Sequence, residues 1–286
     1  MPINFFEMLL WTFRRSENDV VNLYDSLSPI MQLSTDGEML NFGYWNKLTS
    51  TPVEAQNNLC DFTGKFANLS DAKSLIDVGS GILGPAKKWH VDYPNLEIFA
   101  VNINYNQLKT SDSGSIEKLN STSRFMPFNN KSVDRIIALE SAQHFKPFED
   151  FLLESKRILK DNGILLLAIP VMNKNISALN DLGILSFTWS SEHYTMELLT
   201  SKIQDSGLTI VESQKIGSYV YAPLANYYFD HRKELQEKIK TKYSSTTEKI
   251  LYRSLKKMQD SSENGLIDYV ILKCKECSFI WQKFAP

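Results

Sequence analysis

Two groups of residues in this chain have types and spacings that could do chemistry. The first runs from Asp77 to Gly84 (DVGSGILG) and follows a short apolar stretch. A glycine turn between a strand and a helix brings backbone N–H groups close to a bound nucleotide or carboxylate. The second pairs Glu140 with His144, directly after the apolar run 136–139. Because histidine titrates near neutral pH, His144 could accept a proton from a hydroxyl or an amine.

The acid at the start of the glycine run bears on which ligand it binds. The spacing Gly79-x-Gly81-x-x-Gly84 matches the fingerprint of dinucleotide-binding proteins, so an NAD-dependent dehydrogenase is one alternative. Two positions oppose it: Asp77 stands where that fingerprint is apolar, and Asn102 stands where it has an acid for the ribose hydroxyls. An acid before Gly79 instead suits a ligand with a positively charged amino group, such as the methionine end of S-adenosylmethionine.

The elements that must position these residues alternate along the chain. Apolar runs bounded by Gly, Asp, Asn or Pro are separated by segments of helical spacing, which predicts an α/β fold with a parallel sheet covered on both faces. Both groups would then lie at the carboxyl ends of strands, where open α/β folds bind ligands. The predicted strands are 73–78, 96–101, 133–139 and 163–169, extended by 208–211 and 266–274, and the predicted helices are 85–92, 105–119 and 147–160.

Several motifs together resemble class I S-adenosylmethionine-dependent methyltransferases, in particular the group of sterol C-methyltransferases, tocopherol methyltransferases and natural-product methyltransferases. In that group the glycine run reads Asp-Val-Gly-Cys-Gly-x-Gly-Gly-Pro-Ala. Here Pro85-Ala86 is retained, whereas Ser80 replaces the cysteine and Leu83 replaces a glycine. Further similar motifs are 41–45 (NFGYW), 122–128 (TSRFMPF), 132–145 (SVDRIIALESAQHF) and 159–165 (LKDNGIL).

The resemblance implies a fold and a division of the chain. The expected fold is a Rossmann-like, seven-stranded, mostly parallel sheet whose last strand is antiparallel, with helices on both faces and a helical cap. The expected segments are an N-terminal helical cap over 1–70, an S-adenosylmethionine-binding core over 71–216, a helical lid over 217–265, and the last strand with a tail over 266–286. Within the first segment, Thr51-Pro52 with Glu54 predicts a helix start.

The same resemblance implies a set of cofactor contacts. Gly79 and Gly81 would hold the methionine portion of S-adenosylmethionine, Asp77 its ammonium group, and Asn102 the ribose, because an amide can donate and accept. Ile103 would pack on the adenine. The full set of expected cofactor-binding residues is Tyr44, Asp77, Gly79, Gly81, Asn102, Ile103, Gln107, Ser123, Phe125 and Leu139.

For the acceptor, the resemblance implies that His144 and Glu140 face the reacting group, with His144 taking the proton from an oxygen or nitrogen acceptor. An alkene carbon acceptor would instead need a carboxylate and aromatic rings around a carbocation. Aromatic residues outside the core favour an apolar acceptor, of terpenoid, sterol-like or polyketide-like type. The expected pocket residues are Trp45, Trp189, Tyr194, Tyr219 and Tyr221.

A second alternative is a relative of the same fold that binds the cofactor without transferring a methyl group, as a cyclase-type catalyst or a partner subunit. Leu83 and Thr122 keep this alternative open, because the family has glycine and aspartate at these positions. The product expected from methyl transfer is S-adenosylhomocysteine.

Composition limits the remaining possibilities. The chain has 286 residues and a net charge of −2, so we expect no nucleic-acid partner, and the resemblance implies a small-molecule acceptor. Three cysteines are too few for a disulfide framework and favour the cytoplasm. The lone pair Cys274-x-x-Cys277 lacks further ligands nearby, so we expect no metal site. The apolar segment 3–13 is too short to span a membrane, and a cap helix, a subunit contact or a peripheral membrane contact are its alternatives.

Overall fold

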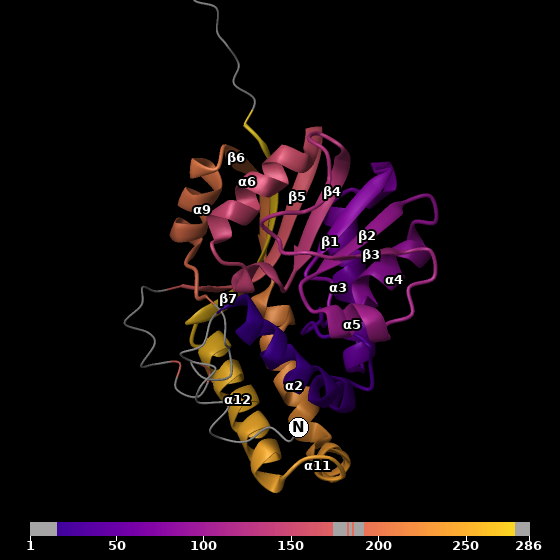
Figure 1. Cartoon of the computed structure of the whole chain (residues 1–286). Helices are drawn as coiled ribbons and strands as arrows, with labels where there is room; N and C mark the ends of the chain where they lie inside the picture. Colours follow the sequence, from indigo (N-terminus) through magenta and orange to yellow (C-terminus); the bar gives the residue numbers. More distant parts are fainter. Residues whose placement is uncertain (1–15, 174–181, 183–184, 186–191, 278–286) are drawn as a thin grey trace, which may run out of the picture.

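The computed structural model describes residues 16–173, 182, 185 and 192–277. Its centre is a seven-stranded sheet in the order β3-β2-β1-β4-β5-β7-β6 (Figure 1). All neighbouring strands pair in parallel except at β7, which is antiparallel to β5 and β6. The predicted mostly parallel sheet with one antiparallel last strand is therefore confirmed. The strands are β1 (Ser74–Val78), β2 (Glu97–Asn102), β3 (Glu117–Asn120), β4 (Val133–Leu139), β5 (Leu159–Met172), β6 (Leu208–Lys215) and β7 (Ile267–Glu276).

Helices cover both faces of the sheet, because successive strand residues point to opposite sides. Leu75 and Ile137 pack in one buried cluster with Trp89, whereas Ile76 and Ile136 pack in the other with residues of α6 and α9. The helices are α2 (Glu17–Thr35), α3 (Pro52–Phe66), α4 (Gly84–Asp92), α5 (Tyr105–Thr110), α6 (Phe148–Ile158), α9 (Met196–Asp205), α10 (Tyr221–Asp230), α11 (Arg232–Lys240) and α12 (Ser245–Glu263).

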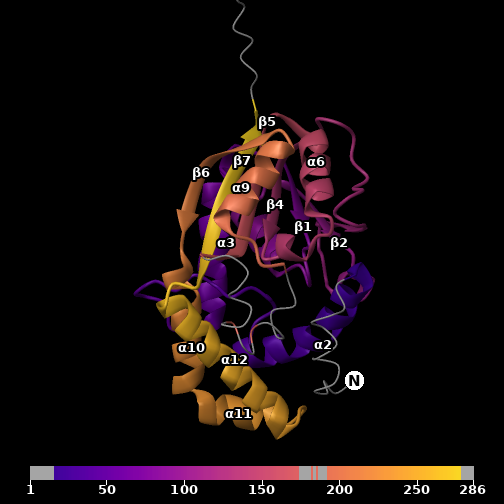
Figure 2. The same ribbon diagram turned by 90° about the vertical axis from the view of Figure 1, so that its left-hand side faces the viewer.

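A helical cap lies beyond the sheet, at the end where the parallel strands terminate (Figures 1 and 2). Its own apolar core joins Leu23 and Ile30 of α2 to Tyr228 of α10 and Ile239 of α11. The helix α3, expected in the same cap segment as α2, instead packs Leu59 and its neighbours against the sheet. The described part of the expected N-terminal segment, residues 16–70, thus contributes helices to two layers of the molecule.

The helix α3 begins where the sequence predicts. The Thr51 hydroxyl caps it by accepting from the Glu54 N–H, and the Glu54 carboxylate accepts from the Thr51 N–H. Pro52 occupies the first turn.

The predicted helix over 105–119 is wrong in its second half. The helix α5 ends at Thr110, and the chain turns through Gly114, whose φ of +52° is left-handed, before it enters β3. Ser, Asp and Gly residues from 111 to 115 favour such a turn. Strand β3 was missed because it is four residues long and largely exposed, with no apolar run to reveal it.

Candidate active site

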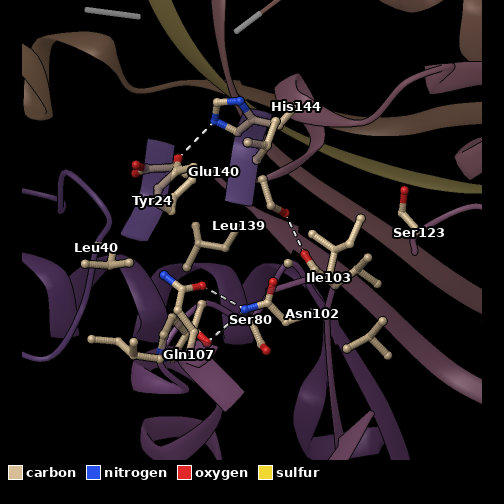
Figure 3. Close-up of a pocket in the computed structure, with 18 of the residues that line it drawn as sticks. Tyr24, Leu40, Ser80, Asn102, Ile103, Gln107, Ser123, Leu139, Glu140 and His144 are labelled. Atoms are coloured by element: carbon tan, nitrogen blue, oxygen red, sulfur yellow. Dashed lines mark hydrogen bonds between the residues drawn. The ribbon is translucent and has the colours of Figure 1, made fainter. Parts of the chain in front are cut away.

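A cavity opens at the carboxyl ends of β1, β2 and β4, under helix α2 (Figure 3). Its open space is about 940 Å³, counting the mouth. Figure 3 shows the labelled side chains converging on it from the sheet, from α2 and from the 36–41 segment. The lining residues are Glu17, Val20, Tyr24, Glu38, Leu40, Asn41, Val78 to Ile82, Gly84, Pro85, Val101 to Ile103, Gln107, Ser121 to Ser123, Leu139 to Ser141, His144 and Phe145.

The turn after β1 needs glycine for two physical reasons. Gly79 and Gly81 have φ values of +76° and +55°, in the left-handed region that other residues adopt only under strain. A Cβ on Gly79 would also lie 2.4 Å from the Cβ of Ser141, which is itself fixed by a bond from its Oγ to the Val78 carbonyl (2.6 Å). The turn is tied to β2, since the Gly79 N–H donates to the Val101 carbonyl (2.8 Å).

Leu83, at a glycine position of the resembling family, does not enter the cavity. Its backbone is left-handed (φ +70°) and its side chain is fully buried against the core on the α4 face of the sheet. The substitution therefore stores backbone strain of roughly 1–2 kcal/mol but leaves the ligand space open.

Asn102 at the end of β2 and Gln107 of α5 lie side by side. The Asn102 amide nitrogen donates to the Gly81 carbonyl (3.0 Å) and to the Gln107 side-chain oxygen (2.9 Å). Its oxygen accepts from the Asn104 N–H (3.2 Å). Both amide hydrogens are thus engaged within the protein, and the oxygen's second lone pair is what Asn102 could offer to a ribose hydroxyl. Gln107 in turn donates to Ser28 Oγ on α2 (2.9 Å).

Asp77 lies one layer below the cavity and does not line it. Its side chain is only 2% exposed, and its Oδ2 has no hydrogen-bond partner. Burial raises the pKa of this carboxyl to about 7. Because Asp77 does not line the cavity, it could act on a bound ligand through its electrostatic field or through a water molecule.

Glu140 directly follows β4, has a left-handed backbone conformation (φ +53°) and lines the cavity. Both carboxylate oxygens accept from the Phe42 N–H (3.0 and 3.1 Å), and Oε1 also accepts from the Tyr269 hydroxyl (3.1 Å). Burial raises its pKa to about 8, although these two donors act in the opposite direction. Glu140 therefore fastens the 39–42 segment to the sheet.

His144 closes the short helix η2 (Ala142–His144) that follows β4. Its Nε2 lies 2.9 Å from the hydroxyl of Tyr24 on α2, and the two rings meet edge to face. Burial, with Glu140 nearby, raises the pKa of Tyr24, so this phenol stays neutral near pH 7. The pair joins the sheet to the cap across the cavity (Figure 3).

Nine of the expected site residues line the cavity: Gly79, Gly81, Asn102, Ile103, Gln107, Ser123, Leu139, Glu140 and His144. The aromatic residues expected there lie elsewhere. Tyr44 stacks on Phe62 and packs against Tyr219, while Trp45 is buried against Tyr227. The turn at Gly43 directs these rings toward α3 and α10 rather than toward the ligand space.

The other expected aromatic contacts also fall outside the cavity lining. Tyr194 is buried against Phe148 on the α6 face, and the fully buried Tyr221 donates to the Asp268 carbonyl (3.2 Å). Phe125 is 74% exposed. Trp189 and the segment 3–13 lie outside the described residues.

Sequence reasoning missed several residues that line the cavity, among them Tyr24, Leu40 and Asn41. Tyr24 lies in the middle of an amphipathic helix, Leu40 directly precedes the motif of residues 41–45, and Asn41 is the first residue of that motif. The one usable signal was that motif, whose rings were assigned to the site in place of the asparagine before them.

The charge of the lining fits a cationic ligand. Glu17 and Glu38 line the cavity and pair with Arg124 and Lys87 outside the lining, and among the described residues neither Lys nor Arg lines it. Glu140 adds a third carboxyl group, whose raised pKa would fall beside a bound cation. A sulfonium or ammonium group is attracted by such a surface, whereas a dinucleotide diphosphate would be repelled. The buried Ser80 Oγ, which also lines the cavity and has no partner, provides a polar group for a ligand. The described residues contain no group of three or more His, Cys, Asp or Glu that could hold a metal ion.

Fold and site together define a Rossmann-like α/β protein with a ligand cavity over the glycine turn. Residues 76–167 match the model of a methyltransferase domain. The chain is 22% identical to erythromycin 3''-O-methyltransferase of Saccharopolyspora erythraea over 96% of this chain and 95% of that protein.

Solved structures share the fold along nearly the whole chain. The [4+2]-cyclase SpnF superposes with a TM-score of 0.73 at 18% identity, over 91% of this chain and 97% of that chain. A mycolic acid cyclopropane synthase complexed with S-adenosylhomocysteine also has a TM-score of 0.73, at 16% identity, over 96% of this chain and 99% of that chain. The protein is a class I S-adenosylmethionine-dependent methyltransferase, and its cofactor is S-adenosylmethionine. No helix in the described part of the chain is both long and apolar enough to cross a membrane.

Proposed function

We propose that this methyltransferase acts on a hydroxyl oxygen of an apolar small molecule. The observation that carries the proposal is the pair of His144 and Tyr24, whose Nε2 and hydroxyl oxygen are 2.9 Å apart at the cavity wall. A hydroxyl must lose its proton as it is methylated, whereas an alkene carbon has none to lose at first. The full-length similarity to a protein named as an O-methyltransferase supports the same choice.

The cofactor supplies an electrophilic methyl group, so the protein's task is to orient two reactants and to handle one proton. We assign to His144 the neutral tautomer that is protonated on Nδ1. Tyr24, held neutral, then donates to His144 Nε2 and keeps oxygen lone pairs for the acceptor's hydroxyl hydrogen. As the new O–C bond forms and the S–C bond breaks, the acceptor proton passes to Tyr24 oxygen while the Tyr24 proton moves to His144. Helix α2 excludes water from this end of the cavity.

An apolar acceptor is supported by the side chains beside this pair. Val20, Leu40, Leu139 and Phe145 line the cavity around its polar floor. The described aromatic residues expected for this role lie outside the lining, so the proposal rests on these aliphatic residues and Phe145. Polyketide-like, terpenoid and sterol-like alcohols all present such a surface next to a hydroxyl.

The test is transfer of a labelled methyl group from S-adenosylmethionine to three panels: hydroxylated apolar compounds with their deoxy analogues, amines, and alkenes. Product should form with the hydroxylated compounds and not with their deoxy analogues. For the best acceptor, His144→Gln and Tyr24→Phe should each lower kcat by roughly 10²- to 10⁴-fold, because the relay needs both groups. The affinity for S-adenosylhomocysteine should change less than about threefold in both. A methyl group found on nitrogen or carbon would refute the oxygen assignment.

A methyl-independent reaction is the second candidate, because a [4+2]-cyclase shares this fold at a TM-score of 0.73. Fold alone does not fix chemistry. Conversion of an acceptor without gain of label, at a rate independent of added S-adenosylmethionine, would favour it.

We also propose the cytoplasm as the location of the protein. Cys60, Cys274 and Cys277 are all free thiols, which suits a reducing compartment. Fractionation of cells with an antibody to the chain would test this.

A further inference from the structure

The strongest unexplained feature of the cavity is the side chain of Asn41. It is only 6% exposed, it lines the cavity, and neither its Nδ2 nor its Oδ1 has a hydrogen-bond partner. A buried amide without partners is destabilising, so such groups mark positions where a ligand or water completes the bonding. The two atoms together require a group that both accepts and donates.

Ser80 is a second group of the same kind. Its side chain is 5% exposed, it lines the cavity, and its Oγ has no partner. It lies between Gly79 and Gly81 in the turn after β1. Two buried polar side chains from segments far apart in sequence therefore face one cavity with unused hydrogen-bonding capacity.

The backbone around Asn41 is held firmly from two sides. Gln56 of α3 donates from its side-chain nitrogen to the carbonyls of Met39 (3.1 Å) and Asn41 (2.9 Å). On the other side, the next residue, Phe42, donates its N–H to the Glu140 carboxylate. Because both neighbours fix the main chain, the Asn41 amide is held at the cavity without partners of its own.

The position of Asn41 indicates which end of the cavity its side chain lines. The adjacent Leu40 lies over the glycine turn, since a Cβ on Gly81 would meet its Cδ1 at 3.5 Å. Asn41 therefore lies between the turn after β1 and the end of β4. Ser123 and Gln107 line the same cavity from the β3 and β2 side. In the sheet order β3-β2-β1-β4, Asn41 is at the end opposite to the nucleoside side.

We propose that Asn41 and Ser80 together bind the amino-acid end of the cofactor. A zwitterion offers acceptors in its carboxylate and donors in its ammonium group, which matches both atoms of the Asn41 amide. The amide nitrogen and the Ser80 hydroxyl donate to the carboxylate, and the amide oxygen accepts from the ammonium group. Glu140, bound to the neighbouring Phe42 N–H, lines the same cavity and offers carboxyl oxygens that can accept from that ammonium group. This inference deepens the cofactor site and does not depend on the acceptor proposed above.

The test compares two ligands that differ only at this end. Calorimetric titration would use S-adenosylhomocysteine and 5′-methylthioadenosine, which has the nucleoside and sulfur but no amino-acid group. Asn41→Leu keeps the volume and removes both polar atoms. It should weaken S-adenosylhomocysteine binding by about 10- to 100-fold, and Ser80→Ala by about tenfold, because each removes bonds to charged groups. Binding of 5′-methylthioadenosine should change less than about threefold.

Ser155→Ala is the matched control. Ser155 is also fully buried with an unpartnered Oγ, but it lies in α6 and not at the cavity, so affinity for both ligands should be unchanged. The melting temperature of unliganded Asn41→Leu should not fall, because the variant removes a buried amide without partners. An equal loss for both ligands, an unchanged affinity for S-adenosylhomocysteine, or a wild type that binds both ligands equally would overturn the proposal. If no acceptor were methylated in the screen above, these titrations would still test the cofactor site, because they need no acceptor.

Discussion

The two sides of the cavity are built in different ways. The sheet side comes from the turn after β1 and the ends of β2 and β4, where backbone bonds such as Gly79 N–H to Val101 carbonyl fix the geometry. The cap side comes from α2 and the 36–41 segment, which reach the sheet through side chains: Tyr24 to His144 and Gln107 to Ser28. The sheet side tolerates few substitutions because backbone bonds fix its geometry. On the cap side, a substitution can remove one side-chain contact and leave the others in place.

The two sides of the cavity also differ in the functional residues that they carry. Expected cofactor contacts of the sheet side line the cavity, since consecutive strand ends of a parallel sheet meet at one edge. The proton-handling pair that we propose spans both sides. The proposed pair is therefore complete only where α2 packs over the sheet side.

The largest effect should come from the sheet side. Gly79→Ala places a Cβ 2.4 Å from the Cβ of Ser141 and forces alanine into a φ of +76°. The turn must then shift, and we expect S-adenosylhomocysteine affinity measured by calorimetry to fall at least about 100-fold. Gly265→Ala is the control, because its φ is +64° but no atom lies within 4 Å of the added Cβ. If both variants kept wild-type affinity, rigidity of the turn would not explain binding.

An intermediate effect should appear where the two sides are fastened together, at Glu140. Its folded-state pKa, about 8, is above that of an exposed glutamate, so the folded protein holds this proton between about pH 5 and pH 8 while the unfolded chain loses it. The free energy of unfolding therefore decreases as pH rises through this window. Glu140→Gln keeps an oxygen for the Phe42 N–H and removes the titration.

Urea unfolding at pH 5 and pH 8 measures this difference. At pH 8 Glu140→Gln should be more stable than the wild type by about 2 kcal/mol, a figure reduced for screening because this side chain lines the cavity, and the two proteins should converge near pH 5. Parallel pH profiles for the two proteins would show that Glu140 does not titrate in this range.

The smallest effect should come from a single contact on the cap side. Ser28→Ala removes the acceptor of the Gln107 side-chain N–H, one of several links between α2 and the sheet. We expect S-adenosylhomocysteine to dissociate about threefold faster in stopped-flow measurements, since one neutral hydrogen bond contributes about 1 kcal/mol. Ser34→Ala, on the same helix, removes only a bond to its own helix carbonyl at Ile30 and should leave the rate unchanged. Equal rates in all three proteins would mean that α2 does not retain the ligand.

Much of the sheet side could be predicted from local sequence. The pattern at residues 77–86 predicts a strand, a glycine turn and a helix, and the structure has all three. The turn at Gly79 was predictable because glycine adopts a positive φ without steric cost, which depends on that residue alone and not on distant packing. The apolar runs predicted six of the seven strands, and the exposed β3 was missed because burial, which creates the apolar pattern, is slight there.

The sequence by itself determined the fold class, the ligand-binding turn and the presence of a histidine at the end of β4. Only the tertiary structure decided what surrounds them: that Tyr24 reaches His144 from 120 residues away, that Glu140 holds Phe42, and that the Tyr44 and Trp45 rings turn toward α3 and α10. The physical reason is range. Turn geometry and strand burial follow from neighbours along the chain, whereas the wall opposite the sheet is selected by packing between segments whose sequences carry no mark of each other.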